Sequence, residues 1–367
     1  MQLTIDSPAD FHVHLRQGPM CALVTPLVRK GGFRLAYVMP NLQPPITTTA
    51  RALEYKAELQ RLEPRVEFLM TLYLSPDLTP EEVRKAKSAG IVGVKSYPRG
   101  VTTNSDGGIE SYEAYYPVFA VMEEVGMVLN LHGEVPSDSS ANISVLNAEP
   151  AFLPWLHRIH AQFPKLRIVL EHATTRAAVE AVRKCGNTVA CTITAHHLAL
   201  TVDDWAGQSL HFCKPVAKMP DDRAALQEVI KEGHPRFFLG SDSAPHPSSS
   251  KTQSTPDKGC AAGLYTSATL LPLVAHLLES FDALDKLEGF VCTFGRRFYQ
   301  FPSERMRVGA IGGGVTLQKL EKTEGTGDVW RGDGDAPAGY LPRVYGKGAE
   351  AIIPFWAGRW IGWQILA

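Results

Sequence analysis

Several features that would place this chain in a particular class are missing from its sequence. No run approaches the roughly 20 apolar residues that a membrane-spanning helix needs. The N-terminus lacks the basic region and the apolar region of a secretory signal. The formal net charge is only -1, so charge gives no reason to expect a nucleic acid or an acidic membrane surface as a partner.

Cysteine is scarce and scattered. No CxxC pair and no disulfide-like spacing occurs in the sequence. We therefore expect reduced thiols and a cytoplasmic protein. The cysteines are Cys21, Cys185, Cys191, Cys213, Cys260 and Cys292.

The chain has 367 residues, of which 44% are apolar, so it can bury a large core and belongs to the globular class. Short apolar runs alternate with segments that have helical spacing or helix-start signals. The predicted strands are 10–16, 34–39, 66–74, 92–95, 128–132, 167–171, 189–193 and 236–240. The predicted helices are 48–62, 79–90, 112–124, 148–162, 176–184, 221–232, 265–278 and 282–293.

Eight strands that alternate with helices indicate parallel βαβ units, and the number eight favours a closed (β/α)8 TIM barrel. A doubly wound open sheet is the alternative, but no GxGxxG follows the first strand. We expect residues 1–302 to form one barrel domain, because barrels of this size are commonly single domains. Residues 303–367 are expected to form a C-terminal extension. Residues 324–348 look irregular, and the Trp-rich end, 352–365, is expected to pack on the barrel.

Two histidines, His12 and His14, stand two residues apart in the first predicted strand. Side chains alternate along a strand, so both imidazoles face the same side and can reach one metal ion. The pair alone is also compatible with two ordinary histidines on a half-exposed strand. Further residues downstream favour the metal site.

Polar residues able to bind a metal follow the ends of five predicted strands, and in a barrel these ends form one face, where active sites lie. Four histidines, an aspartate and one more oxygen donor can hold two divalent ions with a bridging water. Lysine cannot ligate as an ammonium, but after carboxylation by CO₂ it becomes an anionic ligand that can bridge two metals. The residues are His12, His14, Lys95, His132, His172 and Asp242.

These stretches resemble the amidohydrolase superfamily and, within it, the compact class II dihydroorotases. The opening 10–16, DFHVHLR, resembles the start of the superfamily, and GVKSYP at 93–98 resembles the carboxylated-lysine strand. The resemblance keeps the order of the motifs from about residue 8 to 302. The other matching stretches are Met39-Pro40-Asn41, Thr102-Thr103-Asn104, His132-Gly133-Glu134, 171–175 and 240–246.

The resemblance implies a set of metal ligands and one modified residue. His12, His14 and Asp242 are implied to bind the more buried zinc, and His132 and His172 the more exposed one. Lys95, as N6-carboxylysine, is implied to bridge the two zinc ions of each subunit together with hydroxide.

The resemblance also implies how the substrate is held. Arg16, Asn41 and His246 are implied to bind its carboxylate, a task that suits a guanidinium fork. Thr102 and Thr103 are implied to cover the substrate from a loop. The backbones of Lys214 and Ala261 are implied to bind the pyrimidine ring, although 259–263 can be aligned one residue either way.

The implied function is zinc-dependent, reversible cyclisation of N-carbamoyl-L-aspartate to L-dihydroorotate in pyrimidine biosynthesis, by a homodimer, with Asp242 as the catalytic acid and base. Two alternatives stay open: another cyclic amidase, such as a hydantoinase or allantoinase, and a non-catalytic scaffold. Arg16 favours a substrate with a carboxylate, which hydantoins lack. His196 and His197 follow the seventh strand but match no ligand position, so we treat them as structural, with His157, His160, His211, His234 and His276.

Overall fold

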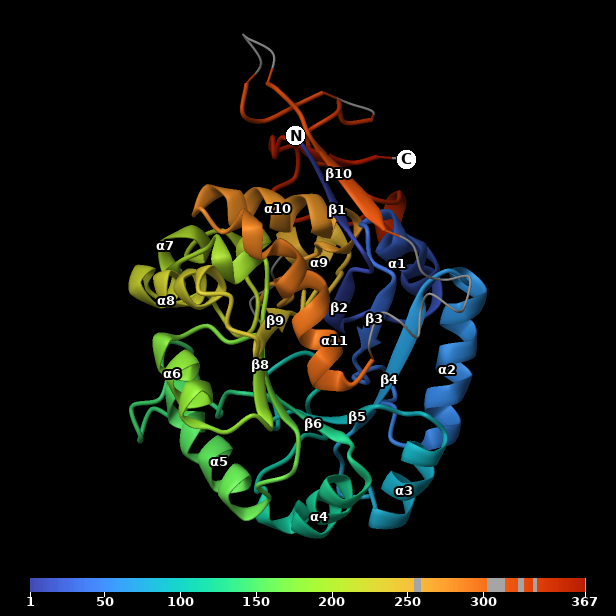
Figure 1. The fold of residues 1–367 in the computed structure, drawn as a ribbon, viewed down its shortest axis with the longest axis vertical. Coiled ribbons are helices and arrows are strands. Elements are labelled where there is room, and N and C mark those ends of the chain that lie inside the picture. The colour runs from blue at the N-terminus through green and yellow to red at the C-terminus, as the bar shows by residue number, and fades with distance from the viewer. Residues whose placement is uncertain (254–258, 302–313, 323–326, 333–334, 367) are drawn as a thin grey trace.

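The computed structural model describes residues 1–253, 259–301, 314–322, 327–332 and 335–366. Its main feature is a parallel sheet of eight strands in sequential order, surrounded on the outside by helices such as α2 to α6 (Figure 1). This arrangement confirms the predicted (β/α)8 barrel. The strands are β2 (Ala9–Val13), β3 (Leu35–Val38), β4 (Glu67–Tyr73), β5 (Gly93–Ser96), β6 (Val128–His132), β7 (Ile168–Glu171), β8 (Val189–Ile193) and β9 (Phe237–Leu239).

The first and last strands close the barrel through backbone contacts just beyond β9. The amide of Asp242 donates to the carbonyl of His12 at 2.9 Å, and the amide of His14 donates to Ser243 at 3.0 Å. A parallel bridge joins Val13 to Ser243. Closure therefore brings the HxH pair next to Asp242, 230 residues later in the chain.

Helices connect the strands, with bounds close to those predicted. α2, α3 and α6 each begin after a threonine whose hydroxyl accepts a hydrogen bond from the third helical amide: Thr48, Thr79 and Thr175. The helices are α1 (Gly18–Lys30), α2 (Thr49–Leu62), α3 (Pro80–Ser88), α4 (Tyr116–Val125), α5 (Ala148–Gln162), α6 (Arg176–Lys184), α7 (Val202–Trp205), α8 (Pro220–Lys231), α9 (Ser248–Thr252), α10 (Leu270–Ser280) and α11 (Phe294–Tyr299).

Single-turn helices account for the differences from the predicted helices. The helix predicted at 112–124 begins as a 3₁₀ turn, and the one predicted at 282–293 consists of a 3₁₀ turn and a π-helix that lead into α11. The short elements are η1 (Glu113–Tyr115), η2 (His196–Leu198), η3 (Ser209–His211), η4 (Ser267–Thr269), η5 (Leu284–Lys286), η6 (Gly289–Thr293) and η7 (Gly348–Glu350).

α1 is absent from the prediction. Its Pro19 lies in the first turn, where proline is tolerated, but Pro26 lies inside the helix, where proline normally breaks the pattern. The helix persists because one face, including Cys21, Val24 and Val28, is buried in the main core. Tertiary packing outweighs the local cost.

The interior of the barrel contains an apolar layer of side chains and a polar layer next to it. A buried cluster lines the inside and is completed by Tyr299 of α11, whose ring stacks on Phe11 at 4.8 Å. Above it, Asn130 accepts from the hydroxyl of Tyr37 and donates to Glu171 and to Tyr299. The polar layer therefore rests on a packed floor. The cluster is Ala9, Phe11, Leu35, Tyr37, Met39, Leu69, Val92, Val128, Val169, Ala190, Phe238 and Tyr299.

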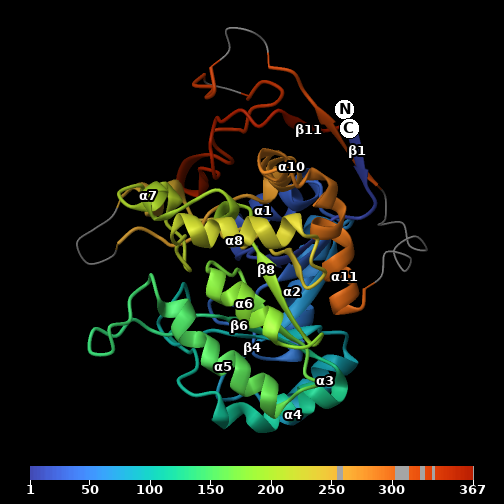
Figure 2. The ribbon, with the colours of Figure 1, turned by 60° about the vertical axis from the view of Figure 1, so that its left-hand side comes forward.

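A second, antiparallel sheet joins the two ends of the chain. β1 (Gln2–Ile5) pairs with β10 (Val315–Lys319), which pairs with β11 (Trp363–Ile365), so the termini lie close together (Figure 2). Trp363 is buried, and its indole N–H donates to Glu279 of α10. The expected boundary between residues 302 and 303 lies outside the described residues, as does part of the expected irregular stretch 324–348.

The described helices include none that is both long enough and apolar enough to cross a membrane.

Candidate metal centre and active site

The ends of five barrel strands bring the six predicted metal ligands to one place. His12 lies in β2 and His14 just beyond it, Lys95 lies in β5, and His132 is the last residue of β6. His172 follows β7 directly and Asp242 follows β9. All six side chains are buried.

A β-bulge in β2 helps to aim the two histidines. The pairing of β2 with β3 shifts register between Asp10 and Val13. Within this stretch Phe11 belongs to the apolar floor while the next residue, His12, belongs to the polar site. Bulges commonly re-aim side chains beside active sites.

His12, His14 and Asp242 form the tightest group, with ligand atoms within 4.8 Å of one another. The Oδ1 atom of Asp242 lies 3.0 Å from Nε2 of His14 and 3.4 Å from Nε2 of His12. Gly240 makes this approach possible, because a Cβ there would lie 2.9 Å from Cβ of His12 and 2.8 Å from Thr192. Two imidazoles and one carboxylate that converge in this way are a metal-binding donor set.

The other three predicted ligands border this group. The ring of His172 lies 5.1 Å from that of His12 and 4.7 Å from that of His132. Nδ1 of His172 and Nζ of Lys95 are buried and have no hydrogen-bond partner among the described residues. Buried polar atoms are rarely left without partners, so these two atoms point to a missing ligand.

Buried carboxylates orient two of the histidines. Oε2 of Glu171 accepts from Nδ1 of His12 at 2.7 Å, which leaves Nε2 free for a metal. Oε2 of Glu134 lies 2.8 Å from Nε2 of His132, which leaves Nδ1. Such partners fix the ring orientation and increase the basicity of a ligating imidazole. Glu134 and Glu171 are not among the predicted site residues, although Glu134 stands two residues after His132 and Glu171 directly before His172, which is the signal in the sequence that points to them.

The protonation states suit metal binding. Burial lowers the pKa of His12, His14 and His172, so all three imidazoles are neutral near pH 7. Burial alone would raise the pKa of Asp242, but the hydrogen bond from His14 and the nearby charges hold it at about 2. Burial lowers the pKa of Lys95 to about 8, despite Glu171 and Asp242, which makes a neutral amine accessible.

Three site residues adopt a left-handed backbone. The φ angles are 59° at Arg16, 42° at His172 and 45° at Asp242. For residues other than glycine this conformation costs on the order of 1 kcal/mol or more, and such strain gathers at functional sites. The fold holds these side chains in place at a cost to stability.

Arg16 and His246 lie together at the rim of the site. Nη2 of Arg16 is 3.2 Å from Nε2 of His246, and Nε of Arg16 donates to the carbonyl of Pro245. Arg16 keeps Nη1 without a partner among the described residues and lines the pocket. His246 also contacts the carbonyl of Ala262 at 2.9 Å. Arg16 therefore presents a cation to the pocket, whereas His246 lies behind it and is not among the lining residues.

Asn41 connects the site to the loop that carries Thr102 and Thr103. Its Oδ1 lies 2.8 Å from Nδ1 of His14, and its Nδ2 donates to the carbonyl of Thr103. Asn104 donates back to the carbonyl of Asn41. Both threonines line the pocket, so the loop lies over the predicted ligands.

Some of the predicted substrate-binding residues line the pocket and others do not. Lys214 lines it, but Ala261 does not: the amide of Ala261 donates to Ser250, and its carbonyl accepts from Lys251. The next residues, Ala262 and Gly263, are in the lining.

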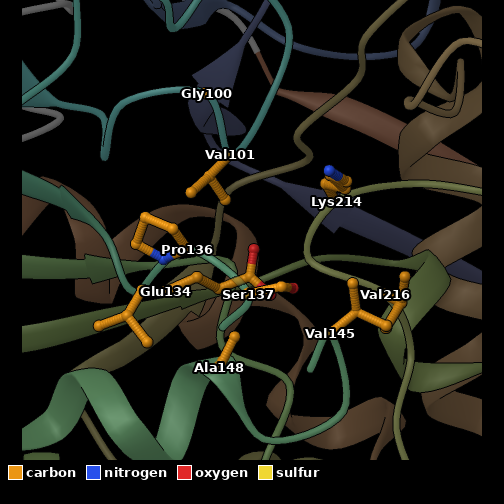
Figure 3. Close-up of a pocket in the computed structure, with 10 residues that line it drawn as sticks. Gly100, Val101, Glu134, Pro136, Ser137, Val145, Ala148, Lys214 and Val216 are labelled. Carbon is orange, nitrogen blue, oxygen red and sulfur yellow. The ribbon is translucent and has the colours of Figure 1, made fainter. Parts of the chain in front are cut away.

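A second hollow of about 630 Å³ lies beside the first and shares Lys214 with it (Figure 3). Val101 on one side, and Pro136 and Ser137 on another, line it. Glu134, which contacts His132, also lines it. The second hollow thus reaches the residues that support the metal ligands.

Comparison with known proteins places these features in a family. The sequence profile of the family described as Amidohydrolase matches residues 16–266. A dihydroorotase of Mycosarcoma maydis is 54% identical, with 100% of this chain and 98% of that protein covered. A dihydroorotase of Saccharomyces cerevisiae is 44% identical, with 99% and 98% covered.

Comparison with solved structures also finds a dihydroorotase. The dihydroorotase of Saccharomyces cerevisiae in complex with 5-fluoroorotic acid superposes with a TM-score of 0.90 at 43% identity, and covers 100% of this chain and 98% of its own. An L-hydantoinase of Arthrobacter aurescens has a TM-score of 0.77 at 18% identity, with 99% of this chain and 83% of that chain covered, a likeness of fold alone.

Proposed function

The chain belongs to the dihydroorotase family of the amidohydrolases, and from this premise we propose that it interconverts N-carbamoyl-L-aspartate and L-dihydroorotate in pyrimidine biosynthesis. One observation carries the choice of substrate: Arg16 and His246 stand together at the rim of a pocket whose floor holds His12, His14 and Asp242. A cationic fork beside a metal site suits a cyclic amide that bears a carboxylate.

The metal content belongs to the same proposal. His12, His14 and Asp242 would hold one Zn²⁺, His132 and His172 would hold a second, and Lys95, as N6-carboxylysine, would supply an anionic ligand to both. The unpartnered, buried Nζ of Lys95 supports this, since its neutral amine can add to the carbon of CO₂, giving a carbamate and releasing one proton. When bound, the two ions polarise the amide carbonyl and supply a nucleophilic water near neutral pH.

Asp242 moves the proton of the reaction. Its pKa of about 2 means that the carboxylate is ionised and ready to accept the proton of the attacking water. In the hydrolytic direction it then returns that proton to the leaving ring nitrogen, first as base and then as acid. Cyclisation follows the same steps in reverse.

Other residues bind and enclose the substrate. The guanidinium of Arg16 pairs with its carboxylate, and the neutral imidazole of His246 contributes a hydrogen bond. The loop with Thr102 and Thr103 would exclude water, and the backbones of Lys214 and of Ala262 and Gly263, which follow Ala261 and line the pocket, would face the ring. Asn41 is held by His14 and Thr103, which supports a role in keeping the loop closed as well as in binding.

Turnover tests the function directly. Zinc-loaded protein is incubated with L-dihydroorotate or with hydantoin, alongside a Lys95→Ala variant, and loss of the ring is followed by ultraviolet absorbance. We expect loss of dihydroorotate that depends on Lys95, with hydantoin unchanged. Turnover of hydantoin alone would make the protein a different cyclic amidase. No turnover of either, with zinc bound, would favour a non-catalytic scaffold.

Two further proposals concern the oligomeric state and the cellular compartment of the protein. We keep a homodimer as the expected assembly, which sedimentation at several protein concentrations tests. We keep the cytoplasm as the expected compartment, in keeping with six cysteines that are all free thiols in the structure.

A further inference from the structure

A second group of potential metal ligands lies outside the site described above. His196 and His197 of η2, just beyond β8, meet Cys213 from the segment between η3 and α8. The three side chains are buried, and their ligand atoms lie within 4.8 Å of one another. We call these three residues the His–His–Cys cluster.

His196 has no partner for either of its ring nitrogens among the described residues. Its side chain is completely buried. One face of the ring is closed by Phe355 of the C-terminal region, whose ring lies 6.4 Å away at a steep angle. Buried polar atoms are rarely left without partners, so the two ring nitrogens of His196 indicate a ligand other than a protein group.

The other two members already have the spacing of metal ligands. Nε2 of His197 lies 3.7 Å from Sγ of Cys213. Two ligands of a tetrahedral zinc, with a Zn–S bond of about 2.3 Å and a Zn–N bond of about 2.0 Å, stand about 3.5 Å apart. The carbonyl oxygen of Pro215 lies 3.0 Å from that Nε2 and 3.2 Å from that Sγ, so it faces the same point.

A hydrogen bond supports His197 from its other side. The hydroxyl of Thr194 lies 2.9 Å from Nδ1 of His197, the kind of outer contact that fixes the orientation of a ligating imidazole. With Nε2 on a metal, Nδ1 carries the proton and donates to this hydroxyl. Burial keeps His196 neutral, because it lowers the pKa of its imidazole to about 3.

We propose that the His–His–Cys cluster binds a third divalent metal, zinc by donor type, through His196, His197, Cys213 and the carbonyl of Pro215. Two imidazoles, one thiolate and one carbonyl oxygen would give the ion four ligands, and histidine nitrogen and cysteine sulfur are ligands that zinc takes. The thiol of Cys213 releases its proton to solvent as the metal binds. The resulting thiolate would offset part of the metal charge in a region that also holds the buried side chains of Lys218 and Lys251.

The proposed site would fix a segment that the active site uses. Cys213 and Pro215 flank Lys214, which lines the active-site pocket. Lys251 holds the same region by donating to the carbonyls of Phe212, Ala261 and Gly263. A metal at the cluster therefore anchors the backbone of Lys214 to the end of β8. We expect its loss to raise KM more than it lowers kcat.

Sulfur provides a signature that separates this site from the active site. None of the six active-site ligands is a cysteine, so metal–sulfur signals can come only from elsewhere. X-ray absorption at the zinc edge of the intact, zinc-loaded protein should show a sulfur neighbour at about 2.3 Å. Spectra that fit nitrogen and oxygen neighbours alone would overturn the proposal, and this measurement needs no variant.

Variants give the second test. Loaded with Co²⁺, the wild-type protein should show the near-ultraviolet charge-transfer band of a cobalt thiolate, and Cys213→Ser should lose both the band and one metal per chain. Cys185→Ser, which alters another buried thiol, is the matched control and should keep both. A band that survives Cys213→Ser, or disappears in Cys185→Ser, would contradict the assignment.

The result is independent of the proposed catalytic function. Lys95→Ala should abolish turnover yet keep the sulfur neighbour of zinc. If the sulfur signal is absent while dihydroorotate is consumed, the third site fails and the catalytic proposal stands.

Discussion

Asp242 combines a structural and a chemical role in one side chain. Its carboxylate contacts His12 and His14 and is ionised, with a pKa of about 2. We expect Asp242→Ala to lower kcat by at least about 10²-fold, since it removes the proton carrier of the reaction. Metal content is measured on the same sample, so that loss of the proton carrier is distinguished from loss of the ion. A nearly normal rate would rule out the assigned role.

Glu171 acts through His12. It accepts hydrogen bonds from His12, Asn130 and Thr192, so it fixes both the tautomer and the orientation of the imidazole. We expect Glu171→Gln to weaken metal binding by about 10–100-fold, measured as zinc lost to a competing chelator. Glu63→Gln is the control, because Glu63 is another buried glutamate but contacts Arg65 rather than a metal ligand. Equal zinc loss in both variants would refute a specific effect.

His246 should bind its ligand as a neutral group. Burial and the charge of Arg16 lower the pKa of His246 from 6.5 to about 3, so the imidazole gains no proton until the pH approaches that value. The affinity for L-dihydroorotate, followed through KM, should therefore not rise through protonation of His246 between about pH 8 and about pH 6. His246→Asn should weaken binding by roughly tenfold at every pH in this range. A rise in wild-type affinity near pH 6.5 that His246→Asn abolishes would contradict this.

The loop over the active site shows how an element can be held by a few polar contacts. Asn104 adopts a φ of 55°, donates to the carbonyl of Asn41 and accepts from Gln43. We expect Asn104→Ala to open the loop, raising KM and lowering kcat by several-fold while zinc content stays unchanged. Ser140→Ala, in a separate exposed loop, should leave both constants unchanged. Loss of zinc in Asn104→Ala would show that the residue supports the metal centre instead.

The elements differ in how well the sequence predicts them. All eight barrel strands are predictable, because each is a short buried run and five of them lead into a residue able to bind metal. β1 is not, because Gln2–Ile5 is mostly exposed and its partner, Val315–Lys319, lies more than 300 residues away. Pairing over that distance leaves no local signal.

The site residues differ in the same way: some are predictable from the local sequence, and others depend on parts of the chain that are distant in sequence. His12, His14 and Asp242 converge as predicted, since strand ends of a barrel share one face. Ala261 stays a prediction: in the structure its backbone is bonded to Ser250 and Lys251 and its neighbours Ala262 and Gly263 line the pocket, a difference of register that a loop sequence does not determine. The unpartnered nitrogens of His196 likewise have no sequence signal, since they depend on which side chains surround the ring.

At the scale of the whole molecule, the two ends of the chain are joined to the barrel through Trp363. Its ring is buried and its N–H donates to Glu279 of α10, while its strand pairs with β10, which also pairs with β1. We therefore propose that the C-terminal extension is part of the folded barrel unit rather than an independent domain. Removing this ring should destabilise the whole molecule.

Trp363→Ala should lower the free energy of unfolding by about 3–5 kcal/mol, the range expected for emptying a buried tryptophan site. Thermal unfolding followed at two wavelengths measures the loss, and KM should stay unchanged because the ring lies outside the active-site lining. Trp330→Ala, at a partly exposed position, should cost less. If the extension unfolds in a separate, earlier transition while the barrel keeps its wild-type midpoint, then the extension is an independent unit.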